Sequence, residues 1–266
     1  MRSTLLTTAI FGLLIVGGAA QEMKPAPEVR RALAPTGTLR VGLYLGNPSS
    51  LVQEPAAGQG KGVGFELGRE LARWLDVPFE PVIHQNNGAV LEALRSGKVD
   101  VVFTNATPAR SKEIDFTQPC VEVEAGYLVA PRSPIATLAD IDKPGVRVGV
   151  MEGSTSSTLL PELLRTASVV KVPTIDRVVE MLSSGGLDAF ATNKSILFEI
   201  SGRLRGSRVL DGRYGVEQLA LGIPKGRERG LEYARRFVAA AISNGLVKGA
   251  MDRAGFRGGT VRPDRP

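Results

Sequence analysis

Short apolar runs alternate along this chain with longer segments in which apolar residues recur every three or four positions. The run Val99 to Phe103 is interrupted only by Asp100, whereas GFELGRELARWL at 64–75 repeats Leu67, Leu71 and Leu75. Continuous β-branched and aromatic runs are typical of strands buried on both faces, and the wider spacing is typical of amphipathic helices. The first part of the chain is therefore predicted to contain strands at 38–45, 79–83 and 99–103 and helices at 64–75 and 89–96.

A second series of the same kind begins at Val146, after a polar, Pro-containing stretch at 131–144. It predicts strands at 146–150, 168–172 and 187–191, helices at 155–165 and 175–183, and two C-terminal helices at 229–244 and 246–255. Strands that alternate with helices usually pair in parallel. We expect an α/β, two-lobed fold in which each lobe is a mainly parallel sheet flanked by helices. Two hinge strands, near 123–127 and 215–221, would join the lobes.

The N-terminus has the pattern of a secretory signal. Arg2 precedes the apolar run Leu5 to Val16, and small residues follow at 17–20. Residues 1–20 are therefore predicted to be a removable signal peptide that leads to a periplasmic location. The Pro-rich residues 21–36 are predicted to be a mobile leader, residues 37–123 plus 218–266 to form lobe 1, and residues 124–217 to form lobe 2.

Composition narrows the chemistry. Cys120 is the only cysteine and His84 the only histidine, so no intramolecular disulfide can form and neither a metal cluster nor a thiol-protease site has its ligands. We expect no metal and no cofactor, and a buried, unreactive Cys120. The net charge is +6, but aromatic residues are only 5% and no stripe mixes them with basic residues, so nucleic-acid binding is poorly supported.

The stretch VVFTNATPARSKEIDFTQPC at 101–120 carries the main candidate for ligand binding. A buried strand runs into polar Thr104 and Asn105, Pro108 prevents the strand from continuing, and Arg110 follows. A guanidinium at such a turn can bind a carboxylate through two parallel N–H donors. The alternative is a surface arginine paired with Glu113 or Asp115.

A second polar turn, Gly153-Ser154-Thr155, is predicted to lie between a strand and the N-terminus of a helix. Free backbone N–H groups and the helix dipole make such a turn suitable for an anion. Simple N-capping by Ser154 or Thr155 is the alternative and needs no ligand. Two small lobes that each carry a carboxylate-friendly turn predict a ligand in the crevice between them.

These segments together resemble the family 3 solute-binding proteins of bacterial ABC importers, which include the polar amino-acid binders. The resemblance covers nearly all of the chain after the signal and is carried by LRVGLY, GKGVGFELGRELARWL, LEALRSGKVDVVFTNATPARSKEIDFTQP, VRVGVMEGSTS and GGLDAFATN. It implies a monomeric binding protein that captures a small carboxylate-bearing solute, an amino acid or related organic acid, by hinge closure. The solute would then pass to an ABC permease in the inner membrane.

The resemblance also implies roles for individual residues. Arg110 corresponds to the arginine that grips the ligand carboxylate, Asn105 to a head-group position, and Phe103 to a main-chain carbonyl acceptor. The second lobe would add donors to the same carboxylate. The remaining positions implied to contact the ligand are Ser154, Thr155, Tyr44, Asn47 and Asn87.

Asn193 departs from the family pattern, because amino-acid binders that this chain resembles usually have an aspartate there, paired with the ligand ammonium. An amide both donates and accepts and does not require a cation. The change favours a carboxylate ligand whose other polar end is neutral or rich in acceptors. The alternative is that an amino acid still binds, with Glu152 or another acid compensating.

An enzyme on the same fold, such as a cyclohexadienyl dehydratase-like lyase, is the competing hypothesis. Catalysis would need a cleft carboxyl group with a raised pKa as general acid. Glu152, beside the anion turn, is the one candidate, and no second acid or nucleophile accompanies it. We therefore expect no catalytic residues.

Overall fold

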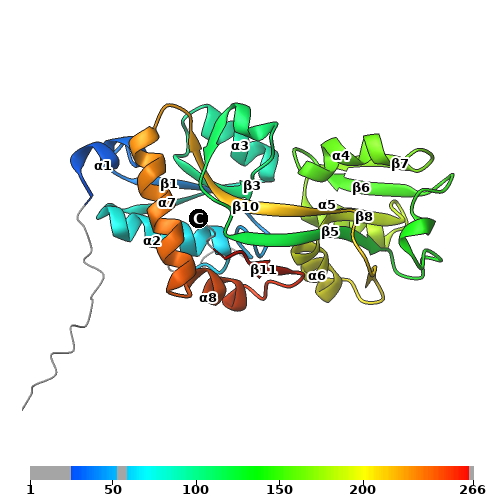
Figure 1. Ribbon diagram of the computed structural model, residues 1–266. Helices are drawn as coiled ribbons and strands as arrows, with labels where there is room; N and C mark the ends of the chain where they lie inside the picture. Colours follow the sequence, from blue (N-terminus) through cyan, green and yellow to red (C-terminus); the bar gives the residue numbers. More distant parts are fainter. Residues whose placement is uncertain (1–24, 53–58, 264–266) are drawn as a thin grey trace, which may run out of the picture.

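The computed structural model describes residues 25–52 and 59–263. The predicted signal peptide, residues 1–20, and leader residues 21–24 lie outside this part. A mixed sheet runs the length of the molecule, with strand order β2-β1-β3-β10-β5-β8-β6-β7 (Figure 1). The strands are β1 (Leu39–Tyr44), β2 (Phe79–His84), β3 (Val101–Asn105), β4 (Ile114–Phe116), β5 (Val121–Val129), β6 (Arg147–Met151), β7 (Ser168–Val172), β8 (Ala189–Asn193), β9 (Arg208–Val209), β10 (Gly215–Pro224) and β11 (Gly259–Val261).

The sheet has two parallel halves, which confirms the α/β two-lobed prediction. Strand β1 pairs in parallel with β2 and β3 in lobe 1, and β6 pairs in parallel with β7 and β8 in lobe 2. Helices cover both halves (Figure 1). They are α1 (Pro27–Leu33), α2 (Val63–Leu75), α3 (Asn87–Arg95), α7 (Glu228–Ser243) and α8 (Leu246–Arg253) in lobe 1, and α4 (Thr155–Leu163), α5 (Ile175–Ser183) and α6 (Lys194–Arg203) in lobe 2; η2 (Arg110–Lys112) and η3 (Leu138–Asp140) are single 3₁₀ turns.

Each lobe has its own apolar core. In lobe 1, the leucine stripe of α2 packs with Phe65 and Phe237, and all of these side chains are fully buried. In lobe 2, Phe190 and Leu197 lie in the core beneath α5 and α6. Because neither core depends on the other lobe, the two lobes can move relative to each other without opening a core.

Strands β5 and β10 join the lobes, as predicted for the two hinge strands. They pair with each other from Ala125–Gly215 to Val121–Leu219. Beyond this ladder β5 pairs with β8 of lobe 2, and β10 pairs with β3 of lobe 1. Because both strands continue without a break through the expected boundaries at 123/124 and 217/218, those boundaries stay a prediction.

The leader is more ordered than expected. Residues 27–33 form α1, with Pro27 in its first turn and Leu33 fully buried against α7. Arg227 Nη1 also donates a hydrogen bond to the Ala32 carbonyl at 2.9 Å. The expectation of a mobile segment is therefore wrong for this part of 21–36, because Val29 and Leu33 supply an apolar face that the prolines conceal in the sequence.

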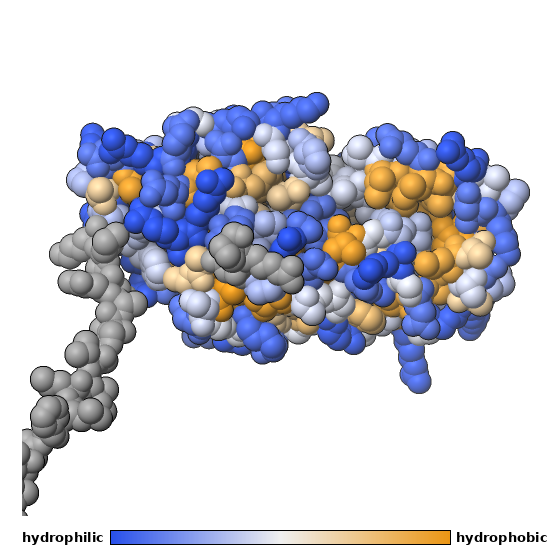
Figure 2. All heavy atoms as spheres, in the orientation of Figure 1, coloured by the Kyte–Doolittle hydropathy of each residue, from blue (hydrophilic) through white to orange (hydrophobic). Residues whose placement is uncertain are grey.

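The surface is mostly hydrophilic, and a notch separates the two lobes along one edge (Figure 2). Within residues 25–52 and 59–263, no helix combines the length and apolarity that a membrane span requires. Cys120 is fully buried in lobe 1, and burial raises the pKa of its thiol to about 12. A buried thiol with a raised pKa agrees with the prediction of an unreactive Cys120.

Candidate functional site

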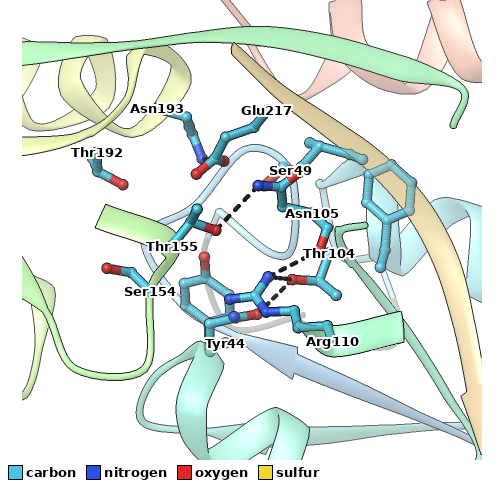
Figure 3. A pocket seen from close by; sticks show the side chains of 13 residues that line it. Tyr44, Ser49, Thr104, Asn105, Arg110, Ser154, Thr155, Thr192, Asn193 and Glu217 are labelled. Atoms are coloured by element: carbon cyan, nitrogen blue, oxygen red, sulfur yellow. Dashed lines mark hydrogen bonds between the residues drawn. The ribbon is translucent and has the colours of Figure 1, made fainter. Parts of the chain in front are cut away.

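A polar pocket lies between the lobes, at the ends of β3 and β8 and beside β10. Side chains from both lobes converge on it (Figure 3). Its lining residues are Tyr44, Ser49, Asn87, Phe103, Thr104, Asn105, Arg110, Ser154, Thr155, Thr192, Asn193, Glu217 and Leu219. Eight of the nine residues predicted from the sequence are in this set, and Asn47 is not.

Arg110 projects from η2 into the pocket with its guanidinium held by neutral acceptors. Nη1 donates to Thr104 Oγ1 at 2.9 Å and to the Asn105 carbonyl at 3.1 Å, and Nη2 donates to the Gly153 carbonyl at 3.2 Å across the cleft. Burial lowers the pKa of Arg110, and the charge of Glu217 opposes that shift. The side chain is therefore a fixed cation whose Nε has no acceptor in the described part of the chain.

The alternative partners of Arg110 are engaged elsewhere. Glu113 pairs with Arg95 at 2.8 Å, and Asp115 pairs with Lys225 at 2.9 Å. Among the described residues, Arg110 forms no ion pair with a carboxylate. Its position therefore fits an anion supplied from outside the chain, since a buried cation is costly without a partner.

Thr155 and Ser154 approach from lobe 2 at the N-terminus of α4. The Thr155 hydroxyl accepts a hydrogen bond from Asn105 Nδ2 at 3.1 Å, which links the two lobes across the pocket (Figure 3). Ser154 Oγ accepts from the Ser157 backbone N–H at 3.1 Å and so caps the helix. The capping alternative is thus present, and both side chains still line the pocket.

Asn193, at the end of β8, lies against a carboxylate. Its Nδ2 donates to Glu217 Oε2 at 3.0 Å, and both side chains are buried. Glu217 comes from the hinge strand β10, on the side of the pocket opposite Arg110 (Figure 3). Burial raises the pKa of Glu217, whereas the hydrogen bond from Asn193, the charge of Arg110 and a hydrogen bond with Thr155 lower it.

The other predicted residues complete the walls. Tyr44 and Phe103 line the pocket, and Asn87 accepts a hydrogen bond from Thr104 Oγ1 at 3.1 Å. Asn47 lies behind Tyr44 instead, fully buried, and its Nδ2 donates to the Tyr44 hydroxyl at 2.5 Å. Asn47 was expected to contact the ligand. Its side chain is hydrogen-bonded to Tyr44 instead and does not line the pocket.

Sequence reasoning missed several wall residues, of which Glu217 matters most. The acid that it named, Glu152, is exposed and outside the lining set. Glu217 was present in the predicted hinge strand, with apolar Leu219 two positions later. Residues two apart in a strand share a face, but nothing in the sequence marked the face of Leu219 as a pocket wall. The other missed residues are Ser49, Thr104, Thr192 and Leu219.

The lobes meet at the rim of the pocket through two glycines. A Cβ on Gly88, at the start of α3, would lie 3.1 Å from Gly153 Cα, and a Cβ on Gly153 would overlap the Gly88 backbone. Asn86 Nδ2 also donates to the Pro173 carbonyl at 3.0 Å. The cleft is thus closed at this point by backbone contact.

The architecture and the pocket have a counterpart among known families. Residues 39–254 match the model of the bacterial extracellular solute-binding proteins, family 3. This protein is a family 3 solute-binding protein. The resemblance inferred from its motifs is therefore confirmed at the level of the family.

Individual relatives of this solute-binding protein are distant. The ABC transporter glutamine-binding protein GlnH of Bacillus subtilis (strain 168) is 25% identical over 177 residues, which cover 62% of this chain and 63% of that protein. The glutamine-binding protein of Geobacillus stearothermophilus is 22% identical over 216 residues, 79% of this chain and 81% of its own.

Solved structures agree on the fold. An ancestral amino acid-binding protein described as a precursor of cyclohexadienyl dehydratase is 26% identical, with a TM-score of 0.72 over 82% of this solute-binding protein and 95% of that chain. A substrate-binding protein of an amino acid ABC transporter from Streptococcus pneumoniae, bound to L-arginine, has a TM-score of 0.76 at 18% identity, covering 89% of this chain and 99% of its own.

Proposed function

We propose that this protein captures a small carboxylate-bearing solute, an amino acid or related organic acid, and delivers it to an ABC permease at the inner membrane. The observation that carries the proposal is Arg110. It is a fixed guanidinium in the pocket, without an ion-pair partner in the described residues, and with Nε and part of Nη2 still able to donate. A carboxylate matches this fork of donors.

Capture would proceed by closure of the lobes around the solute. Arg110 and Asn105 belong to lobe 1, whereas Ser154 and Thr155 belong to lobe 2. A carboxylate held by both sets binds more tightly to the closed form than to the open form, and this difference shifts the equilibrium towards closure. The bending falls on β5 and β10, because no other strands join the halves of the described sheet. The closed molecule would present both lobes to the permease.

The test is the Arg110→Ala variant of the mature protein in titration calorimetry and thermal shift, against the standard L-amino acids and matched organic acids. Two charge-assisted hydrogen bonds contribute about 3 kcal/mol together, so we expect at least about 100-fold weaker binding. The melting temperature without solute should hardly change. Arg236→Ala is the matched control, because this arginine lies on α7 and pairs with Glu232 at the surface. Normal binding by Arg110→Ala would remove the clamp and the proposal with it.

A lyase is the second candidate, and one observation favours it. Glu217 is a buried pocket carboxyl group whose pKa is raised, as a general acid requires. A binding protein returns its solute unchanged. Mass spectrometry of the solute after prolonged incubation with the protein distinguishes a lyase from a binding protein. A product that forms with wild type and is absent with Glu217→Gln would establish catalysis.

A further inference from the structure

Glu217 is a carboxylate without a cation. In the part of the chain that the structure describes, it forms no ion pair with a lysine or arginine. Its hydrogen-bond partners are the neutral Asn193 amide, at 3.0 Å, and the Thr155 hydroxyl. Its side chain is buried. A buried carboxylate supported only by neutral donors remains costly to ionise, and a cation placed against it would recover much of that cost.

Arg110 does not supply this cation. It lies on the other side of the pocket, bonded to Thr104, Asn105 and Gly153, and acts on Glu217 only through space (Figure 3). The pocket thus has a positive and a negative group, each without a contacting counter-ion in the described residues. A dipolar ligand with a carboxylate at one end and an ammonium at the other would satisfy both.

The other groups that face Glu217 are uncharged. Burial raises the pKa of both Tyr44 and Tyr214, so these neighbours remain neutral phenols near pH 7. On the adjacent strand β5, Glu124 is engaged with Lys194 at 2.7 Å and Arg213 at 2.8 Å. Asn105 and Asn193 complete the surroundings with amides. Among the described residues that line the pocket, Arg110 and Glu217 are therefore the only charged side chains.

We infer that Glu217 binds the ammonium group of a zwitterionic α-amino acid whose carboxylate lies on Arg110. This inference rests on the proposed function. The negative charge comes from the hinge strand β10, and Asn193 at the end of β8 orients it through one hydrogen bond. The amide at position 193 then serves as a donor to the acid and does not signal a ligand without an ammonium group.

The expected pH dependence of binding follows from the charge of this carboxylate–ammonium pair. In the unliganded site, burial raises the pKa of Glu217, so the group holds a proton to higher pH than a free carboxyl group does. The ligand ammonium favours the ionised form, and the proton leaves to solvent as the carboxylate–ammonium pair forms. Affinity should therefore rise with pH up to the pKa of the unliganded site and be flat above it.

The experiment is titration calorimetry of the mature protein and its Glu217→Gln variant with the twenty standard L-amino acids. For each amino acid that binds, the analogue lacking the amino group is tested as well. In wild type we expect amino acids to bind better than their analogues. Glu217→Gln should weaken amino-acid binding about 10- to 100-fold, the loss expected for one charge-assisted hydrogen bond, and should leave the analogues unchanged or improved. Glu152→Gln, which removes an exposed acid near the mouth of the cleft, is the matched control.

Two further readouts distinguish a ligand contact from a structural role. In buffers of different ionisation enthalpy, wild type should release up to one proton per ligand near the pKa of Glu217, and Glu217→Gln should release none. The double variant Asn193→Asp with Glu217→Gln moves the carboxylate to β8 and should restore amino-acid preference. Amino-acid binding that survives Glu217→Gln, or a wild type that binds only the analogues, would overturn this inference while the Arg110 clamp stands. If Arg110→Ala binds normally, the proposed function fails instead.

Discussion

The two lobes carry the same arrangement at the amino ends of their strands and different chemistry at the carboxyl ends. In lobe 1, the backbone and guanidinium of Arg40 donate three hydrogen bonds to Asp100, and the Asp100 N–H returns one to the Arg40 carbonyl at 2.8 Å. Arg147 and Asp188 repeat all four bonds in lobe 2. From these aspartates the sequence D-x-x-x-T-N leads in both lobes to the pocket.

At the pocket the repeated Thr-Asn pairs diverge in what they touch. Asn105 donates to Thr155 of the opposite lobe, and its neighbour is the cation Arg110. Asn193 donates to the carboxylate of Glu217. The repeated strand arrangement thus places Asn105 and Asn193 at equivalent positions in the two lobes. Their different neighbours, Arg110 and Glu217, give the two positions opposite local charge.

The largest difference that we expect between the lobes concerns the stability of the Arg–Asp pairs. The Asp100 side chain is fully buried and also lies 3.6 Å from Arg227, whereas Asp188 and Arg147 are 33% and 42% exposed. Asp100→Asn should lower the free energy of unfolding by about 3 kcal/mol, because it leaves guanidinium groups without a counter-ion. Asp188→Asn should cost about 1 kcal/mol or less. Urea denaturation measures both, and equal losses would show that burial does not distinguish the pairs.

The same change at the two amides should have unequal electrostatic results. Asn193→Asp places a second carboxylate within hydrogen-bond distance of Glu217, and like charges there should lower the free energy of unfolding by about 1–2 kcal/mol at pH 8. The loss should be smaller at pH 5 than at pH 8, because protonation of either carboxyl group removes the repulsion. Asn105→Asp should lower the free energy of unfolding by less than Asn193→Asp does, because its new carboxylate lies beside the cation Arg110. Chemical denaturation at both pH values tests this, and a larger loss at position 105 would contradict it.

The smallest expected effect is the acid dependence of the lobe 2 pair. The hydrogen bond from Arg147 lowers the pKa of Asp188 below its ordinary value. A depressed carboxyl pKa adds stability above the unfolded value of about 3.9, and this stability is lost as the pH falls through the folded value. The difference in stability between wild type and Asp188→Asn should therefore shrink below about pH 4. Denaturation midpoints from pH 7 to pH 3 provide the measurement, and a constant difference would show that the charge of Asp188 contributes nothing.

Much of the fold could be predicted because its signals are local. The strand Ser168–Val172 and the helix Ile175–Ser183 were predicted with the bounds that the structure gives them. Arg110 could be proposed from a buried strand followed by a polar turn. The same logic failed for α1, where prolines concealed the spacing of Val29 and Leu33, and α6 was not anticipated at all.

Glu217 could not be assigned to the pocket from local pattern, because its position depends on the register between distant strands. Leu219 pairs with Asn105 at the end of β3, and this pairing brings Glu217 between the two repeated asparagines. The sequence contains the repeat D-x-x-x-T-N, which would have marked Asn105 and Asn193 as equivalent positions. No pattern in the sequence indicates which acidic residue lies next to these two asparagines.

The contact between Gly88 and Gly153 limits the size of the solute around which the cleft can close fully. Because the two backbones touch without side chains, no rotamer change at the rim can make room for a larger solute. A solute too long for the pocket would therefore keep the two glycines apart. Such a solute could still occupy Arg110, yet the molecule around it would stop short of its final shape. Discrimination by size would then appear in how far the lobes close, and not only in whether the solute occupies the pocket.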